Sequence, residues 1–129
     1  MAVQPDMIGI IVSDMARALA FYRLLGLAIA EGAEAEGHVE VITPDGYRIA
    51  WDSEDRIRSF DADWQPPRGQ RIGLAFKCDS PADVDALYRQ IVAAGFHGHK
   101  QPWDAFWGQR YAQVADPDGT VIDLFAPLG

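Results

Sequence analysis

The sequence predicts an α+β fold made of two copies of one unit, in which a strand and a helix are followed by three more strands. Two internal matches carry this prediction. Pro44-Asp45-Gly46 recurs as Pro117-Asp118-Gly119, and an alternating strand pattern follows each copy. Ala20-Phe21-Tyr22-Arg23 recurs in a similar form as Ala86-Leu87-Tyr88-Arg89. Two matches in the same order indicate an internal repeat.

The first half of the chain begins with a β-branched, apolar strand over 8–12. Asp14 is placed to cap a helix over 15–25, which Gly26 ends. The apolar positions of this helix share one face: Met15, Leu19, Tyr22 and Leu25. We expect three strands to follow, near 27–31, 38–43 and 47–52.

The second half repeats this order with a strand over 71–78, whose apolar residues alternate. Ser80 caps the next helix, Pro81 occupies its first position, and Gly95 lies past its end. We expect the last three strands near 97–101, 109–115 and 120–126.

Residues 61–70 are rich in Pro and Gly and form the expected hinge between the halves. Neither half is large enough to be stable alone. We therefore expect one domain over 1–129, with the first module at about 5–60 and the second at about 71–129.

Alternation along the strands separates a face covered by helices from an opposite face. Trp51 falls on the helix side and is expected in the core. The opposite face would hold Met7, Gly9, Ile11, Arg48, Ala50 and Asp52 in the first half, and Arg71, Gly73, Ala75, Lys77, Val121, Asp123 and Phe125 in the second. A curved mixed sheet that encloses this face would form a cleft.

Composition limits the function classes. The formal net charge is −8, and the bases are scattered, so nucleic acid is not expected as a partner. Cys78 is the only cysteine, which leaves no disulfide framework and no cysteine-cluster zinc site. The sequence has no apolar run of about 18 residues and no signal peptide. We expect a cytoplasmic protein that does not bind membranes.

The segments VSDMARALAFYRLLGL near the start and DPDGTVIDLF near the end together resemble the glyoxalase/bleomycin-resistance/extradiol-dioxygenase superfamily, the vicinal oxygen chelate proteins. The resemblance spans essentially the whole chain. It implies paired βαβββ modules that form an open, curved sheet around a cleft, usually in a homodimer.

Metal-dependent members of this superfamily place ligands at four sites, on the first and last strands of each module. Carried over, these sites fall on Met7 or Gly9, on Arg71 or Gly73, on Ala50 and on Asp123. A shift of two residues would replace Ala50 with Asp52, but no shift supplies a histidine. The histidines, His38, His97 and His99, are expected away from these sites. The resemblance therefore favours the metal-free, antibiotic-binding members, with no cofactor and no metal.

The segment PWDAFWGQRY, residues 102–111, holds four aromatic residues: Trp103, Phe106, Trp107 and Tyr111. Their irregular spacing indicates a loop that presents ring faces to a planar ligand, with a cation–π contribution if the ligand is positive. Alternatively the rings plug the cleft or pack in a dimer interface. Phe60 and Trp64 could form an opposite wall.

Several polar residues are expected on the cleft floor: Arg71, Asp123, Asp52, Glu40 and Gln113. Arg71 and Asp123 either form an ion pair or each contact ligand atoms. The leading hypothesis is a non-catalytic protein that sequesters a planar aromatic antibiotic of the bleomycin, mitomycin or quinoxaline type and confers resistance. The alternative is an enzyme without metal, with Asp123 or Asp52 as general base, or, third, a metal-dependent glyoxalase or dioxygenase.

Overall fold

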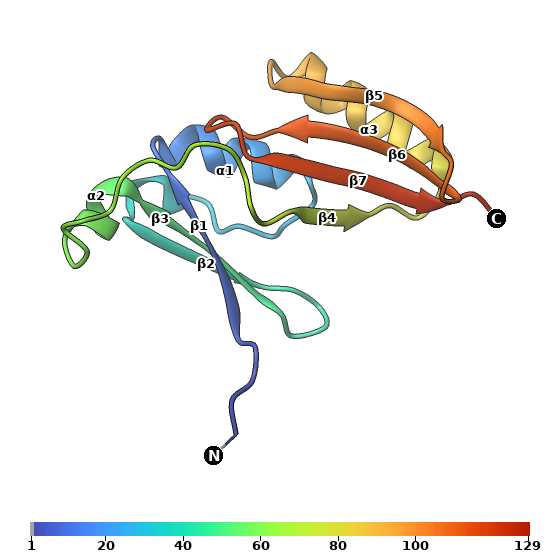
Figure 1. Ribbon diagram of the computed structural model, residues 1–129. Helices are drawn as coiled ribbons and strands as arrows, with labels where there is room; N and C mark the ends of the chain where they lie inside the picture. The colour runs from blue at the N-terminus through green and yellow to red at the C-terminus, as the bar shows by residue number, and fades with distance from the viewer. Residues whose placement is uncertain (1) are drawn as a thin grey trace. The chain divides into compact units, whose positions relative to one another are not determined.

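The computed structural model describes residues 2–129, and the chain divides into two compact units (Figure 1). The first unit ends at Pro66 and the second comprises Pro67–Gly129, so the boundary lies inside the segment 61–70. Each unit contains one mixed β-sheet, which confirms the α+β fold class. Among the described residues, no helix has the length and apolar character to cross a membrane.

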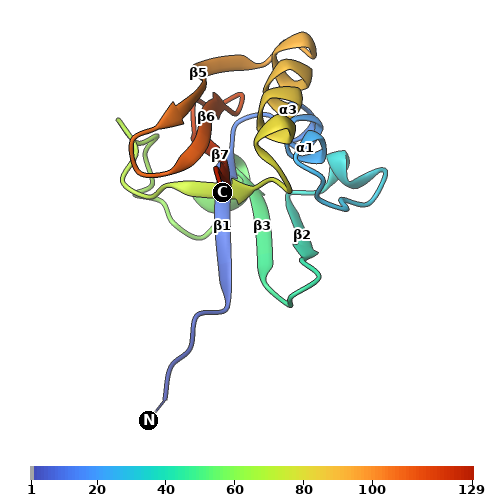
Figure 2. The same ribbon diagram turned by 90° about the vertical axis from the view of Figure 1, so that its right-hand side faces the viewer.

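The sheet of the first unit has the strand order β1-β3-β2. These strands are β1 (Met7–Val12), β2 (His38–Ile42) and β3 (Arg48–Ser53), and they run side by side in Figure 2. β1 pairs with β3 in parallel, and β2 pairs with β3 antiparallel. The parallel pairing requires a crossover, which α1 (Met15–Leu24) begins.

α1 starts and ends where the sequence predicts. The Asp14 side chain accepts a hydrogen bond from the backbone N–H of Arg17 at 3.2 Å, and this caps the helix. Gly26 follows the helix with a φ of 89°, a conformation that favours glycine. The helix buries a wider face than the four predicted positions, because Phe21 is fully buried beside Leu19 and Tyr22.

The predicted strand near 27–31 is wrong. This segment is irregular and leads into a short 3₁₀ turn, η1 (Ala33–Ala35). Arg23 of α1 holds it by donating to the carbonyl of Ala30 at 2.7 Å and by pairing with Glu34. A backbone carbonyl bound by a side chain in this way does not need a neighbouring strand. The sequence pattern also did not predict α2 (Glu54–Arg58), which Ser53 caps.

The second unit has the complete predicted order of strand, helix and three strands. Its elements are β4 (Leu74–Lys77), α3 (Pro81–Ala93), β5 (His97–Ala105), β6 (Gln109–Ala115) and β7 (Val121–Pro127). The sheet order is β4-β7-β6-β5, and α3 lies across one face of it (Figure 1). Val84 and Ile91 of α3, with Ile122 and Leu124 of β7, are fully buried and form its core.

The two Pro-Asp-Gly turns have the same hydrogen-bond pattern. In the first, the Thr43 hydroxyl accepts from the backbone N–H of Tyr47 at 3.0 Å. In the second, the Asp116 carboxylate accepts from the N–H of Thr120 at 2.9 Å. Gly46 and Gly119 have φ angles of 87° and 85°. The internal repeat therefore extends to the geometry of the turn that positions each last strand.

The predicted faces agree with the burial of β7 but not with that of β3, where Ala50 of the expected open face is as fully buried as Trp51. Ile122, Leu124 and Ala126 are fully buried, whereas Val121, Asp123 and Phe125 are half-buried. Trp51 is fully buried, as its position in the alternation predicts. In the second unit, whose residues are all described, α3 is the only helix, so Asp123 and Phe125 lie on a face that no helix of this unit covers.

Candidate functional site

The aromatic segment 102–111 is a β-hairpin rather than the predicted loop. β5 continues through Ala105 and β6 begins at Gln109, so only the tip of the hairpin is a turn. Gly108, with a φ of 92°, closes this turn by donating to the carbonyl of Ala105 at 3.0 Å. The register of β5 shifts twice before Trp103. These irregularities hide the period-two pattern of a strand, which is why the sequence suggested a loop.

The four aromatic residues of the hairpin gather around Trp107. Its ring centroid lies 5.5 Å from that of Trp103, 4.8 Å from that of Phe106 and 5.1 Å from that of Tyr111, all in edge-to-face geometry. The indole N–H of Trp107 donates to Gln109 at 2.8 Å, which fixes the ring. Trp107 remains 47% exposed and Phe106 91% exposed. Aromatic surface is therefore available to a ligand.

A polar row adjoins this cluster on the same side of the sheet. The backbone register places Gln113 of β6 opposite Asp123 of β7 and places Tyr111 opposite Phe125. The Gln113 amide donates to Asp123 at 2.9 Å and to the Tyr111 hydroxyl at 3.3 Å. Burial, together with a hydrogen bond to Asp123, raises the pKa of Tyr111 to about 12. The Tyr111 phenol therefore stays protonated at neutral pH.

We call the surface formed by Trp103, Trp107, Tyr111, Gln113 and Asp123 the aromatic face. Lys100, which lies opposite Gln113 in the backbone register, places its ammonium 4.9 Å from the ring centroid of Trp103. The indole Nε1 of Trp103 is buried and has no hydrogen-bond partner among the described residues. The sequence predicted every member of this face as a ligand contact, although it assigned no neighbour to Gln113.

Arg71 does not join the aromatic face. It lies ahead of β4, is exposed, and forms no ion pair with Asp123 among the described residues. The strand registers explain the error. Ala50 is paired with Gly9, and its equivalent Asp123 is paired with Ala75, so Gly9 is equivalent to Ala75. Two residues earlier on each strand, Met7 is therefore equivalent to Gly73 and not to Arg71. Gln113 takes the place beside Asp123 that the sequence offered to Arg71.

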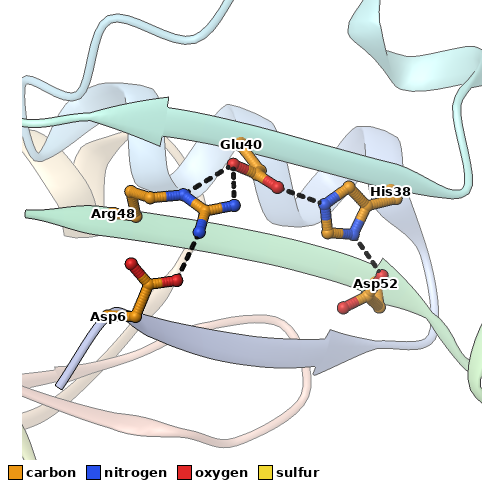
Figure 3. Close-up of polar contacts among 5 residues, drawn as sticks. All are labelled: Asp6, His38, Glu40, Arg48 and Asp52. Atoms are coloured by element: carbon orange, nitrogen blue, oxygen red, sulfur yellow. Dashed lines mark hydrogen bonds and ion pairs between the residues drawn. The ribbon is translucent and has the colours of Figure 1, made fainter. Parts of the chain in front are cut away.

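The first unit carries a separate row of charged side chains on the face of its sheet opposite α1 (Figure 3). His38 lies between two carboxylates, with its Nδ1 2.5 Å from Asp52 and its Nε2 2.7 Å from Glu40. Arg48 extends the row by donating to Glu40 at 2.7 Å and to Asp6 at 2.5 Å. We call these five residues the charged row.

The sequence predicted Asp52 and Glu40 on the cleft floor. It placed His38 away from the carried-over ligand positions, which is wrong for Asp52, because His38 contacts it directly. Two signals were available. His38 and Glu40 are two residues apart on a strand and therefore share a face. Antiparallel pairing through the turn at Pro44-Asp45-Gly46 places His38 opposite Asp52. The metal-ligand positions of the superfamily do not indicate this pairing, because they lie on the first and last strands of each module and His38 lies on β2.

We expect the contacts of His38 with Glu40 and Asp52 to weaken as the pH rises. Hydrogen bonds to Glu40 and Asp52 raise the pKa of His38 above its usual value of 6.5. The stabilisation is complete below the pKa of the unfolded chain and is lost as the pH rises through the higher folded-state pKa. An NMR titration of the His38 ring measures this pKa. It should fall in Asp52→Asn, whereas an unchanged value would contradict the contact.

Phe60 and Trp64 lie at the end of the first unit and do not join its charged row. Phe60 is 72% exposed, and the Trp64 ring is covered by the guanidinium of Arg58 at 4.9 Å. Their role as an opposite wall for a ligand stays a prediction.

A hollow of about 250 Å³ lies between α3 and the β5–β6 hairpin. It is lined by Asp85, Tyr88, Arg89, Gln101, Pro102 and Arg110. Arg110 is already neutralised by Asp85 at 2.9 Å and by Asp104 at 3.1 Å. Small-molecule sites are usually larger, at roughly 300–1,000 Å³. The aromatic face is therefore the better candidate site.

The comparison with known protein families gives a match over residues 4–124 to the model described as Glyoxalase/Bleomycin resistance protein/Dioxygenase superfamily. The chain belongs to this superfamily. The match includes both units and the whole aromatic face, so the resemblance read from the two end motifs is confirmed. Comparison with curated proteins gives no match.

Solved structures of this superfamily share the fold. A glyoxalase/bleomycin resistance protein/dioxygenase family enzyme from Burkholderia phytofirmans PsJN has a TM-score of 0.82 at 22% identity, over 95% of this chain and 98% of that chain. A glyoxalase-related enzyme from Fulvimarina pelagi has a TM-score of 0.79 at 21% identity, over 95% and 87%. A protein of unknown function from Agrobacterium tumefaciens reaches 28% identity with a TM-score of 0.72, over 99% and 97%.

The positions carried over from metal-dependent superfamily members do not fit a divalent ion. Met7 offers only a thioether, and Ala50 has no donor atom in its side chain. Gly73, which the register assigns in place of Arg71, has no side chain.

Asp52, the alternative to Ala50, is bound by His38. Asp123 is therefore the one remaining oxygen ligand among these positions. Asp123 is bound by Gln113 instead. Within residues 2–129, no group of three or more His, Cys, Asp or Glu side chains is arranged to hold a metal.

Proposed function

We propose that this superfamily member binds a planar aromatic small molecule on the aromatic face and sequesters it. The observation that carries the proposal is the cluster of edge-to-face rings around Trp107, which leaves aromatic surface exposed beside a polar row. Stacking on exposed, rigid rings gives a large contact area at a low entropic cost. An antibiotic of the bleomycin, mitomycin or quinoxaline type matches this chemistry, and binding it would confer resistance.

Titration of the tryptophan fluorescence with bleomycin, mitomycin and a quinoxaline-type compound tests this proposal. We expect at least one compound to quench the emission at micromolar concentration. Trp107→Ala should weaken its binding by roughly tenfold or more, because a central aromatic contact dominates a small interface. Trp107 is half exposed, so its removal should leave the fold intact.

Tyr47→Ala is the matched control, because Tyr47 is a 40% exposed aromatic residue that is not part of the aromatic face. It should leave the affinity unchanged. Trp64→Ala tests the predicted opposite wall in the same assay. Absence of any response to all three compounds would count against sequestration. Turnover of a bound compound that Asp123→Asn abolishes while binding persists would instead support an enzyme. The expected homodimer is tested separately by equilibrium sedimentation.

A further inference from the structure

The two amide hydrogens of Gln113 are both used within the protein. An ionised carboxylate only accepts hydrogen bonds, so Gln113 must direct its NH₂ group, not its carbonyl, at Asp123. The same nitrogen donates its second hydrogen to the Tyr111 hydroxyl. Burial raises the pKa of the Tyr111 phenol, and Asp123 raises it further, as a neighbouring carboxylate that favours the protonated hydroxyl does. Gln113 and Asp123 therefore have no donor hydrogen left for a ligand.

The indole donors of the aromatic face are not available either. The Nε1–H of Trp107 is bound by Gln109 at 2.8 Å. The Nε1–H of Trp103 has no partner within residues 2–129, but it is buried and out of reach of a ligand at the surface. Lys100 is a further donor, and its ammonium lies over the Trp103 ring.

The hydrogen-bonding atoms of Gln113 and Asp123 that remain free to bind a ligand are acceptors. The Gln113 carbonyl oxygen accepts no hydrogen bond in the described residues, and the Asp123 carboxylate has lone pairs beyond those that Gln113 and Tyr111 occupy. Asp123 is half-buried and forms no ion pair with the described residues. A half-buried carboxylate that faces an acceptor of a ligand would lose hydration without compensation.

We propose that the aromatic face selects planar ligands that carry an N–H or O–H donor over ligands of the same shape that offer only an acceptor. This inference rests on the proposed function and adds the ligand class. Stacking on Trp107 would supply affinity for flat rings of any substitution. The acceptors of Gln113 and Asp123 would then favour those rings that carry a hydrogen-bond donor. The preferred ligands include amines, amides and amidinium groups attached to an aromatic ring system.

Equilibrium dialysis with carbazole and acridine at pH 8 tests the inference. The two probes are planar tricyclic nitrogen heterocycles of similar size, but the ring nitrogen of carbazole donates and that of neutral acridine accepts. We expect carbazole to bind about tenfold more tightly, which corresponds to one hydrogen bond to a charged acceptor. Asp123→Asn should remove most of this preference, because its amide adds donors to the row.

The matched control is Asp79→Asn, which changes the net charge equally at an exposed residue outside the aromatic face and should keep the preference. Equal affinity for the two probes would overturn the inference and leave the proposed function standing. Tighter binding of acridine, lost in Lys100→Met, would also overturn it and identify Lys100 as the selecting donor. Failure of both probes to bind would overturn the inference, and the fluorescence titration with the three antibiotics would then test the proposed function separately.

Discussion

Replacing Trp51 with alanine should lower the free energy of unfolding by about 3–5 kcal/mol, the usual cost of removing a fully buried aromatic side chain. Trp51 is the largest fully buried side chain of the described residues, and its ring lies 5.3 Å from that of Tyr22. Truncation would leave a cavity between β3 and α1 that surrounding side chains cannot close completely. Urea unfolding of the wild type and the variant measures the difference.

Trp51→Phe is the informative control. The indole Nε1 of Trp51 is buried and finds no hydrogen-bond partner in the part of the chain that the structure describes, so its removal costs no hydrogen bond and relieves an unsatisfied donor. We expect a loss of less than about 1.5 kcal/mol, because most of the ring volume remains. If Trp51→Phe lowered the free energy of unfolding as much as Trp51→Ala, the indole N–H would have to donate a hydrogen bond, which would contradict the unsatisfied donor described above.

Gly98→Ala should destabilise the second unit by roughly 0.5–1.5 kcal/mol, because the half-buried Tyr88 side chain must leave its preferred rotamer to make room for the new methyl group. A Cβ atom at Gly98 would lie 2.3 Å from the Tyr88 hydroxyl oxygen, 2.8 Å from its Cζ and 3.0 Å from a methyl carbon of Val92. Gly98 therefore allows α3 to approach β5 closely. Thermal or urea unfolding measures the effect.

Two variants separate the clash from a general preference for glycine. Gly73→Ala introduces a Cβ with no atom within 4 Å, so it should change the stability by less than about 0.5 kcal/mol. Tyr88→Ala combined with Gly98→Ala should cost less than the sum of the single changes, because the second substitution no longer meets the ring. Strict additivity would contradict the proposed contact between Tyr88 and Gly98.

The parts of the fold that local patterns encode were predictable. Asp14 and Ser80 cap the two long helices, because a short side chain with an oxygen acceptor binds the free N–H groups of the first turn wherever it precedes a helix. The alternation in β7 likewise separated Leu124 from Asp123. These signals depend on neighbours within a few residues, so no tertiary information is needed to read them.

The parts that failed depend on contacts between distant residues. The strand predicted near 27–31 did not form, because Arg23 binds the Ala30 carbonyl and Glu34. The aromatic segment has the local pattern of a loop. It forms two strands because β5 pairs with β6, which places Trp103 opposite Tyr111. Local propensity does not determine either outcome, since strand formation depends on the partner that supplies the hydrogen bonds.

The sequence by itself determined the order of elements in the second unit, the two Pro-Asp-Gly turns and the superfamily. Only the tertiary structure decided which polar group faces which. The register of β6 against β7 gave Asp123 to Gln113 instead of Arg71, and the register of β2 against β3 placed His38 beside Asp52. A shift of two residues keeps every side chain on its face and changes all of its neighbours, so alternation alone cannot fix these pairs.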